Sequence, residues 1–272
     1  MISIITINKN NAEGLKQTIK SVIDQTYRLV DFIVVDGDST DGSKQVVNEF
    51  KGQLDVALSE PDTGIYNAMN KGIRVAKGDY LLFLNSGDKL LNNDVLTNIA
   101  PLLNTADIIS GNIVIEDEKG ITHRCLSQDE ISWRYFSAMS LYHQATFISR
   151  KTFDTYGLYD ERFKLGGDYE FFIRIFFKYN ASYKHIPEFV SYFKSDGISN
   201  NSAYAELNKK EAQLAREYNL SKQVLTVFAE QLEFERSNMH WLYLKSRSSA
   251  LYRRTFAFLY ALRYHINRLI KK

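Results

Sequence analysis

The sequence predicts an α/β protein with a mainly parallel central sheet covered by helices, followed by a helical C-terminal region. In the first third of the 272-residue chain, short apolar runs rich in β-branched residues alternate with segments of helical periodicity. The run Tyr80–Leu84 is continuously apolar and ends in Asn-Ser-Gly-Asp, which is typical of a strand buried on both faces. Strands that alternate with helices across short connections predict a parallel, doubly wound sheet.

The first half of the chain contains four expected strands with a helix between each pair. Every strand is followed by polar or glycine-containing turns, and every helix carries apolar residues three or four positions apart. The strands are expected at Ile2–Ile7, Phe32–Val35, Asp55–Leu58 and Tyr80–Leu84, and the helices are marked by Leu15, Ile19, Val22 and Ile23, by Val46, Val47 and Phe50, and by Ile65, Met69, Ile73 and Val75.

The second half is less regular. Its expected elements are a helix over 95–103, one or two strands over 108–115, a strand over 144–148, a helix that opens at Asp168, and a strand over 183–190. From about residue 204 the pattern is helical to the end. We therefore expect a ligand-binding α/β domain over 1–203 and a helical region over 204–272.

Composition excludes several classes of protein. The single cysteine, Cys125, allows no internal disulfide and no cysteine-based zinc site, which fits a reducing compartment. The N-terminus lacks a basic segment and a small-residue cleavage site, so a signal peptide is not expected. No run reaches about 18 consecutive apolar residues, so no transmembrane helix is expected either.

Four polar loops follow the expected strands, at Thr6–Asn8, Asp36–Ser39, Asp62–Gly64 and Asn85–Asp88. Ligands of open α/β sheets bind outside the carboxyl ends of the strands, so these loops should converge on one site. Clustered carboxylates repel one another unless hydrogen-bond donors or a cation satisfy them. A nucleoside diphosphate with Mg²⁺ or Mn²⁺ supplies both. The alternative is that these are ordinary turn and capping residues, which Ser, Gly and Asp often are.

These motifs, in this order and spacing, carry a resemblance that covers roughly residues 2–200. They are Ile4-Ile5-Thr6-Ile7-Asn8, Val35-Asp36-Gly37-Asp38-Ser39-Thr40-Asp41-Gly42, Glu60-Pro61-Asp62-Thr63-Gly64-Ile65-Tyr66-Asn67-Ala68-Met69-Asn70-Lys71-Gly72, Phe83-Leu84-Asn85-Ser86-Gly87-Asp88, His143-Gln144 and Gly167-Asp168-Tyr169-Glu170. The chain resembles the family-2 glycosyltransferases, which implies the Rossmann-like fold of the A-type nucleotide-diphospho-sugar transferases.

The resemblance implies a nucleotide-diphospho-sugar donor and a set of residues that bind it. Thr6, Asn8, Asp36 and Asp38 should hold the base and the ribose, Asp62 and Gly64 should close over the base, and Asn67, Lys71, Ser86 and His143 should line the donor site. Lys71 would pair with the diphosphate. The alternative is that Lys71 is a solvent-exposed lysine on the surface of its helix. His143 is expected beside the diphosphate or the acceptor. The alternative is that it is a hydrogen-bonded polar residue without a role in binding.

Asp88 matches the last acidic residue of the family's Asp-x-Asp metal motif, whereas the first position of that motif is Ser86. One carboxylate should then hold the divalent cation, Mg²⁺ or Mn²⁺, together with diphosphate oxygens and water. This departure predicts weak metal affinity in the absence of nucleotide.

Asp168 is the candidate catalytic base. A transfer that inverts the anomeric centre needs one carboxylate to take the proton of the acceptor hydroxyl while the nucleoside diphosphate leaves. As an alternative, Asp168 after Gly166-Gly167 could cap the following helix, a role compatible with the first. Glu170 is the neighbouring fallback for the base.

The segment Met239–Lys272 holds eight Lys and Arg residues and no Asp or Glu, whereas residues 1–238 hold 26 basic and 32 acidic ones. On a helical projection its basic residues lie opposite an apolar, aromatic-flanked face, which suits an anionic membrane surface. The alternative is a helix that packs on the preceding domain or forms a homodimer. Nothing else in the sequence supports nucleic-acid binding.

The resulting hypothesis is an inverting hexosyl- or N-acetylhexosaminyl-transferase that uses a UDP-sugar. Its acceptor would be a glycan carried on polyprenyl diphosphate, in bacterial surface polysaccharide synthesis, and the enzyme would be cytoplasmic and peripheral on the inner face of the cell membrane. The alternative is a catalytically inactive nucleotide-sugar-binding module, with Ser86 as the sign of decay. A nucleotidyltransferase is disfavoured because Asn8-Lys9-Asn10-Asn11 is not a Gly-rich loop.

Overall fold

The structure is a computed structural model that describes residues 1–195, 202–236 and 259. It divides into two compact units, Met1–Asn219 and Leu220–Lys272. In the second unit the described helix is α9 (Lys222–Arg236). Apart from Leu259, the basic segment Met239–Lys272 lies outside the described residues, and so do the expected membrane and dimer contacts of that segment.

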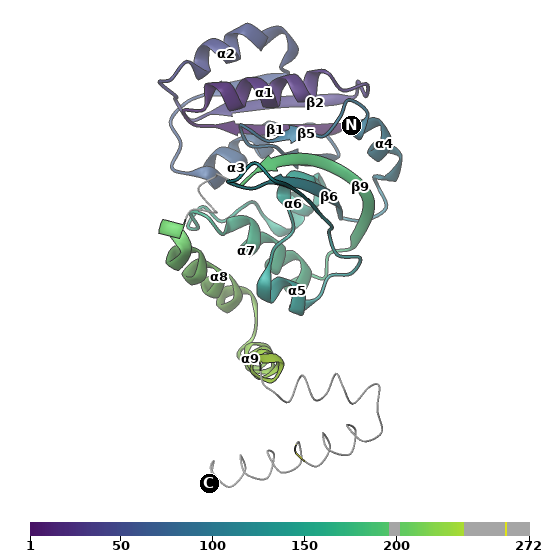
Figure 1. The fold of residues 1–272 in the computed structure, drawn as a ribbon, viewed down its shortest axis with the longest axis vertical. Helices are drawn as coiled ribbons and strands as arrows, with labels where there is room; N and C mark the ends of the chain where they lie inside the picture. Colours follow the sequence, from purple (N-terminus) through teal and green to yellow (C-terminus); the bar gives the residue numbers. More distant parts are fainter. Residues whose placement is uncertain (196–201, 237–258, 260–272) are drawn as a thin grey trace. The chain divides into compact units, whose positions relative to one another are not determined.

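The first unit is built on one nine-stranded sheet with helices on both faces (Figure 1). The spatial order is β3-β2-β1-β4-β8-β6-β9-β5, with β7 paired to β6. The strands are β1 (Ile2–Asn8), β2 (Val30–Asp36), β3 (Val56–Ser59), β4 (Tyr80–Phe83), β5 (Lys89–Leu90), β6 (Ile108–Glu116), β7 (Thr122–Cys125), β8 (Thr146–Ser149) and β9 (Tyr183–Lys194).

Four strands of the N-terminal half, β3-β2-β1-β4, pair in parallel, as the sequence predicts. Between them run α1 (Ala12–Ile23), α2 (Ser43–Phe50) and α3 (Ile65–Val75), each at an expected place. In the β1–β2 ladder Asn8 stands directly opposite Asp36, so the polar ends of the two strands are neighbours. The turns after these strands therefore gather at one edge of the sheet.

The rest of the sheet is mixed. Strand β8 runs antiparallel to both β4 and β6, whereas β6 and β9 are parallel to each other. The segment 108–115, expected as one or two strands, lies within the single strand β6. The strand expected over 144–148 begins at Thr146, because His143–Ala145 forms a 3-10 turn. The short strands β5 and β7 were not expected from the sequence.

The remaining helices of the described unit are short, apart from the last. They are α4 (Val95–Ile99), α5 (Trp133–Ala138), α6 (Arg150–Tyr156), α7 (Gly167–Ile173), which continues as a π-helical turn over Arg174–Lys178, and α8 (Ala205–Asn219), with further 3-10 turns at Lys51–Gln53, Ala100–Leu102 and Ser202–Tyr204. None of the described helices combines the length and apolar character that crossing a membrane requires.

One prediction about α7 is wrong. The N-cap of this helix is Gly166, not Asp168, and no side chain bonds to the helix start from that position. Asp168 lies in the first turn, where its Oδ1 accepts a hydrogen bond from the N–H of Tyr169 at 2.8 Å. Asp168 therefore bonds to the first turn from within the helix, with one oxygen, and is not the N-cap residue. Helix α8 belongs to the same unit as α7, although the sequence analysis assigned it to the C-terminal region.

The core has a layer on each face of the parallel strands. Helices α1 and α2 cover one face, where Leu15 and Ile19 pack with Ile4 and Val34 (Figure 1). Helix α3 covers the other face, and a Cβ added at Gly72 of α3 would lie only 2.4 Å from Ile5 Cγ2. This glycine lets the helix backbone lie close against β1. The position of α3 matters because it carries several of the candidate site residues.

Candidate active site

The four polar loops do converge. The N–H of Gly37 donates to the carbonyl of Asn8 at 2.9 Å, and the N–H of Ser86 donates to the carbonyl of Ile7 at 3.1 Å. The loop around Asp62 reaches the same place, because a Cβ added at Gly37 would lie 2.0 Å from Asp62 Oδ2. The turns after β1, β2, β3 and β4 thus meet at one edge of the sheet, as expected for parallel strands.

Asp36 ends β2 and is completely buried. Its Oδ1 accepts from Asn8 Nδ2 at 2.8 Å, and its Oδ2 accepts from the N–H of Ser39 at 3.0 Å and from the hydroxyl of Ser59 at 2.9 Å. Burial on its own would raise the pKa of Asp36, but the hydrogen bonds from Ser39, Asn8 and Ser59 outweigh it and lower the pKa. The carboxylate therefore fixes the shape of this loop.

Asp38, Asp62 and Gly64 are further residues expected around the base and ribose. Asp38 has a positive φ of 60° and forms a half-exposed ion pair with Lys44 at 2.6 Å. Asp62 Oδ1 accepts from the N–H of Gly64 at 3.1 Å, so the two residues form one turn. Gly64 itself has a φ of 143°, a conformation that side chains rarely adopt.

Thr6 and Ser86 lie at the base of the loops. Thr6 is fully buried, and among the residues that the structure describes its hydroxyl has no hydrogen-bond partner, although polar atoms of this kind are usually satisfied. The hydroxyl of Ser86 donates to the carbonyl of Ile7 at 3.2 Å. Ser86 thereby ties the end of β4 to β1.

Asn67 and Lys71, one turn apart on α3, both contact protein partners. Asn67 Nδ2 donates to Glu161 Oε2 at 2.8 Å. The Lys71 ammonium group donates to the carbonyl of Pro61 at 2.7 Å and forms an ion pair with Glu60 at 2.8 Å. Lys71 is 17% exposed, so it is not the solvated lysine of the alternative interpretation. It holds the loop that carries Asp62.

Asp88 is the second buried carboxylate at this edge, at 4% exposure. Its Oδ2 accepts from the N–H of Asn85 at 2.8 Å. Burial raises the pKa of Asp88 to about 7, against the opposing effects of the nearby His143 and of the Asn85 N–H. Asp88 is therefore a carboxylate with few donors, in contrast to Asp36.

His143 connects Asp88 with Asp168. Asn85 Nδ2 lies 3.3 Å from His143 Nε2, and His143 Nδ1 lies 3.4 Å from Asp168 Oδ2. With Asn85 donating, Nε2 accepts and the ring proton on Nδ1 faces Asp168. Burial alone would lower the pKa of His143, but the hydrogen bond to Asp168 and the charges of Asp168 and Asp88 raise it. The structure thus brings together three residues that are far apart in the sequence.

Tyr66, at the start of α3, contacts the same carboxylate. Its hydroxyl lies 3.1 Å from Asp168 Oδ1 and 2.6 Å from the carbonyl of Leu165, so one proton is shared between two acceptors. Burial and the charge of Asp168 raise the pKa of Tyr66 well above its usual value, which keeps the hydroxyl a donor. Both Asp168 oxygens therefore have a fixed neighbour, while the side chain keeps 20% exposure.

Glu170, the fallback base, is paired elsewhere. It is buried, its Oε1 lies 3.0 Å from Arg174 Nε, and Asn219 Nδ2 donates to the same oxygen at 2.9 Å. This pairing leaves Asp168 as the carboxylate that is both held and reachable.

The donor set at the end of β4 fits a hard divalent cation. The Asp88 carboxylate is buried and has only weak compensation, and the buried Asn85 Oδ1 has no hydrogen-bond partner. Carboxylate and amide oxygens are the ligands that Mg²⁺ and related ions prefer. Within residues 1–195, 202–236 and 259, no cluster of three or more His, Cys, Asp and Glu side chains is arranged for a metal. The prediction that one carboxylate, Asp88, holds the cation stays a prediction.

Sequence analysis missed several residues of the site. Tyr66, Asn85 and Ser39 lie inside the motifs but were given no role in binding or catalysis, and Ser59 and Glu161 were not considered. A hydroxyl on the buried face of α3 was an available signal for Tyr66. Nothing in the sequence marks Glu161, whose two oxygens bind Asn67 and Asn70 across a wide sequence separation.

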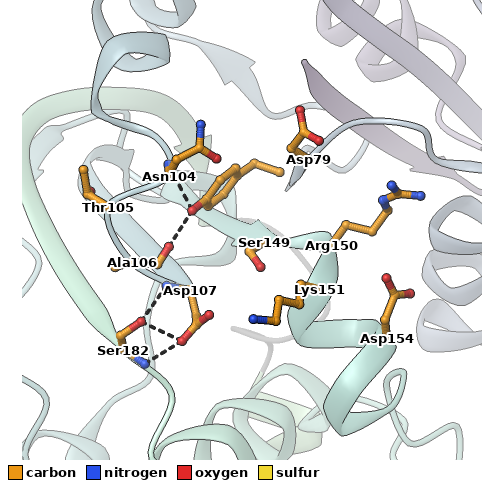
Figure 2. Close-up of a pocket in the computed structure, with 11 residues that line it drawn as sticks. Asp79, Asn104, Thr105, Ala106, Asp107, Ser149, Arg150, Lys151, Asp154 and Ser182 are labelled. Carbon is orange, nitrogen blue, oxygen red and sulfur yellow. Dashed lines mark hydrogen bonds between the residues drawn. The ribbon is translucent and has the colours of Figure 1, made fainter.

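A separate pocket of about 490 Å³ lies at the opposite edge of the sheet (Figure 2). Its lining includes Asp79, which precedes β4, Asp107, which precedes β6, and Ser149, which ends the antiparallel strand β8. No candidate site residue lines it. The pocket is therefore distinct from the converging loops.

Comparisons with known proteins agree with this geometry. A family model described as Glycosyl transferase family 2 matches residues 3–156, more than half of the chain. Asp168 and α8 lie beyond that match. A PGL/p-HBAD biosynthesis glycosyltransferase of Mycobacterium bovis is 30% identical over 218 residues, which cover 77% of this chain and 83% of the relative.

Solved structures confirm the fold. S. aureus TarS in complex with UDP-GlcNAc is 20% identical with a TM-score of 0.65, and the match covers 90% of this chain and 75% of that one. In its complex with UDP the TM-score is 0.59, and the match covers 71% of this chain and 60% of that one. A mannosyltransferase from Pyrobaculum calidifontis in complex with GDP-Man and Mn²⁺ is 15% identical with a TM-score of 0.56, covering 94% and 86%.

The resemblance and the fold class inferred from the sequence are therefore confirmed. On the extent of the family match and the identity to a relative matched over most of its length, this chain belongs to glycosyl transferase family 2.

Proposed function

We propose that the chain is an inverting glycosyltransferase that moves a hexose or N-acetylhexosamine from a UDP-sugar to a glycan acceptor. The observation that carries the proposal is the placement of Asp168, a partly exposed carboxylate held between His143 and Tyr66 beside the nucleotide-binding edge. A single base of this kind is what an inverting transfer requires, whereas most glycosidases use a pair of carboxylates.

In the proposed reaction Asp168 accepts the proton of the acceptor hydroxyl as that oxygen bonds to the anomeric carbon. The bond from the anomeric carbon to the diphosphate oxygen breaks, and the UDP leaves with that electron pair. Tyr66 and His143 hold the two carboxylate oxygens, which fixes the direction of proton transfer. Asp88 and Asn85 Oδ1 would hold Mg²⁺ or Mn²⁺, which supplies positive charge to the leaving diphosphate.

The donor would lie across the loops after β1, β2 and β3. Asn8, Asp36 and Ser39 form a rigid wall, and the turn at Asp62 and Gly64 packs onto it at Gly37. The complexes of the structural neighbours with UDP, UDP-GlcNAc and GDP-Man support a nucleotide-sugar donor. Lys71 would stabilise the loop that covers the base instead of pairing with the diphosphate directly.

The decisive test is Asp168→Asn in the full chain, assayed by UDP release from a panel of UDP-sugars with Mn²⁺ and acceptor. Turnover should fall by about 10³-fold or more, while the dissociation constant of UDP stays within about twofold of wild type. Near-normal turnover by this variant would exclude Asp168 as the base. A wild-type chain that binds UDP-sugars tightly but never releases UDP would instead be a binding module.

The acceptor is proposed to be a glycan on a polyprenyl diphosphate lipid at the inner face of the cell membrane. The relative named for teichuronic acid biosynthesis in Bacillus subtilis, 33% identical over 92 residues, supports a role in surface polysaccharide synthesis. The basic composition of Met239–Lys272 supports contact with an anionic membrane surface.

Membrane contact can be tested with the full chain and vesicles that contain anionic lipid. Substituting Arg247, Arg253 and Arg254 together by Glu should reduce vesicle binding strongly and leave turnover on a soluble acceptor unchanged. If binding persists, the basic residues do not contact lipid. If the substitutions instead change the mass in solution, the segment forms a homodimer.

A further inference from the structure

The segment that leads into Asp168 is held by a single side chain of α8. Glu211 is buried at 5% exposure, and its carboxylate accepts hydrogen bonds from three successive backbone N–H groups. The N–H of Lys164 donates to Oε1 at 2.9 Å, and those of Leu165 and Gly166 donate to Oε2 at 2.9 and 2.7 Å. Such a row of N–H groups is an anion-binding concavity, here filled by the chain's own carboxylate.

Two adjacent glycines fit this segment between α8 and α3. A Cβ added at Gly166 would lie 3.3 Å from Glu211 Cβ, and one added at Gly167 would lie 2.7 Å from the ring of Tyr66. The hydroxyl of Tyr66 also lies 2.6 Å from the carbonyl of Leu165. The backbone before Asp168 therefore contacts an element on each side. Gly167 has no room for a side chain, and a side chain at Gly166 would require a small shift of Glu211.

Helix α8 makes two further contacts with α7. Arg216 Nη1 donates to the hydroxyl of Tyr169 at 3.1 Å, and Asn219 Nδ2 donates to Glu170 Oε1 at 2.9 Å. Glu211 and Asn219 lie on one helical face, on either side of the fully buried Ala215. Helix α8 thus contacts the backbone before Asp168 and the two residues after it.

We propose that Glu211 is a positioning residue for the transfer reaction and that it sets where Asp168 stands relative to the acceptor hydroxyl. This proposal rests on the proposed role of Asp168 as the base. Glu211 acts through the backbone of 164–166 and contacts no reacting group. A displacement of about 1 Å at a reacting centre can lower the rate by about 10²-fold. The hydrogen bonds by which Glu211 fixes this segment should therefore affect the rate of transfer.

Glu211→Gln is the sharpest test, because its carbonyl oxygen can keep the bonds from Leu165 and Gly166 while its amide group opposes the Lys164 N–H. Glu206→Gln is the matched control, because Glu206 is exposed on the same helix. For Glu211→Gln we expect kcat to fall by about 10- to 100-fold. The KM for the UDP-sugar and the dissociation constant of UDP should stay within about twofold, and Glu206→Gln should match wild type in all three.

A purely structural role predicts a different result. It would lower the melting temperature and leave kcat unchanged at temperatures where the variant is fully folded, and this outcome would overturn the proposal. Equal losses in kcat and in UDP binding would also overturn it, because they indicate a general distortion of the site.

Amide hydrogen exchange of the full-length protein gives a readout that does not depend on turnover. The amide of Lys164 should be protected in wild type and in Glu206→Gln, and should exchange at least about tenfold faster in Glu211→Gln, where the amide group of the glutamine opposes it. Unchanged protection would show that Glu211 does not hold this segment. If Asp168→Asn keeps normal turnover, the proposed base fails, whereas a dead Asp168→Asn beside a normal Glu211→Gln rejects only the positioning role.

Discussion

Asp36 and Asp88 are both buried aspartates at the carboxyl ends of parallel strands, and β1 alone separates their strands in the sheet. Asp36 accepts bonds from Asn8, Ser39 and Ser59, and its pKa is lowered. Asp88 accepts one backbone N–H at 2.8 Å, and burial raises its pKa to about 7. The same residue type in equivalent places is thus satisfied in one loop and left short of donors in the other.

The difference separates a carboxylate that is satisfied by the protein from one that is buried with little compensation. A carboxylate with a full set of donors stabilises the loop around it and has little left to offer a substrate. A buried carboxylate without such donors is costly when ionised, unless a cation or a proton compensates it. The comparison therefore indicates that Asp36 shapes the loop, and it supports the proposal that Asp88 binds a cation.

The largest expected effect comes from Asp88→Asn, which keeps the shape of the side chain and removes the charge. Metal-dependent transfer should fall by about 10³-fold or more, because a cation at the leaving diphosphate contributes several kcal/mol. A chelator should abolish turnover in wild type, and added Mn²⁺ should restore it. Transfer by the variant that still responds to Mn²⁺ would contradict the assignment of Asp88.

The second expected effect concerns stability and pH in the presence of a chelator. The folded state keeps a proton on Asp88 up to about pH 7, whereas the unfolded chain loses this proton near pH 3.8. The contribution of Asp88 to the free energy of unfolding is therefore fully present below about pH 4. This contribution is lost as the pH rises from about 4 towards 7, and the loss is at most ~4 kcal/mol. In urea unfolding, Asp88→Asn should remove the loss and be more stable than wild type at pH 8. Parallel pH profiles of the two proteins would contradict the raised pKa.

Asp36→Asn should do the reverse and destabilise the fold. An amide in that place can accept from one side only, so at least one of the donors from Asn8 and Ser39 loses its acceptor. We expect a loss of ~2–3 kcal/mol in the free energy of unfolding at pH 7. Asp154→Asn, at an exposed position, should change it by less than ~0.5 kcal/mol. A negligible effect of Asp36→Asn would remove the distinction between the two carboxylates.

The smallest expected effect comes from removing the hydroxyl of Tyr66 that contacts Asp168. Tyr66→Phe removes that donor and should lower kcat by about tenfold, consistent with one hydrogen bond to a charged group. Tyr159→Phe is the matched control, because Tyr159 packs against Tyr66 at 5.5 Å between ring centroids and its buried hydroxyl has no partner. The control should leave kcat unchanged and the fold equally or more stable. Equal kcat in both variants would remove Tyr66 from the site.

The parallel half of the fold was predictable element by element, and the other half was not. In the first half the strands are short segments rich in apolar and β-branched residues, and each helix has its own periodic apolar face, so the signal is local. In the second half β5 and β7 are two- and four-residue strands whose exposure follows no alternation. Strand β5 depends on pairing with β9, which lies far away in the sequence, whereas β7 forms a hairpin with the preceding strand β6.

The sequence by itself determined which residues gather at the sheet edge. Parallel strands bring their carboxyl ends together, so Asn8 and Asp36, which end β1 and β2, and Asp88, in the turn after β4, had to meet there. What each side chain contacts within that gathering was decided by tertiary structure alone. The bond between Tyr66 and Asp168 joins residues 102 positions apart, and Glu211 reaches its three N–H groups across 45 to 47 positions. Contacts at such separation leave no local period in a sequence, because they depend on how whole elements pack.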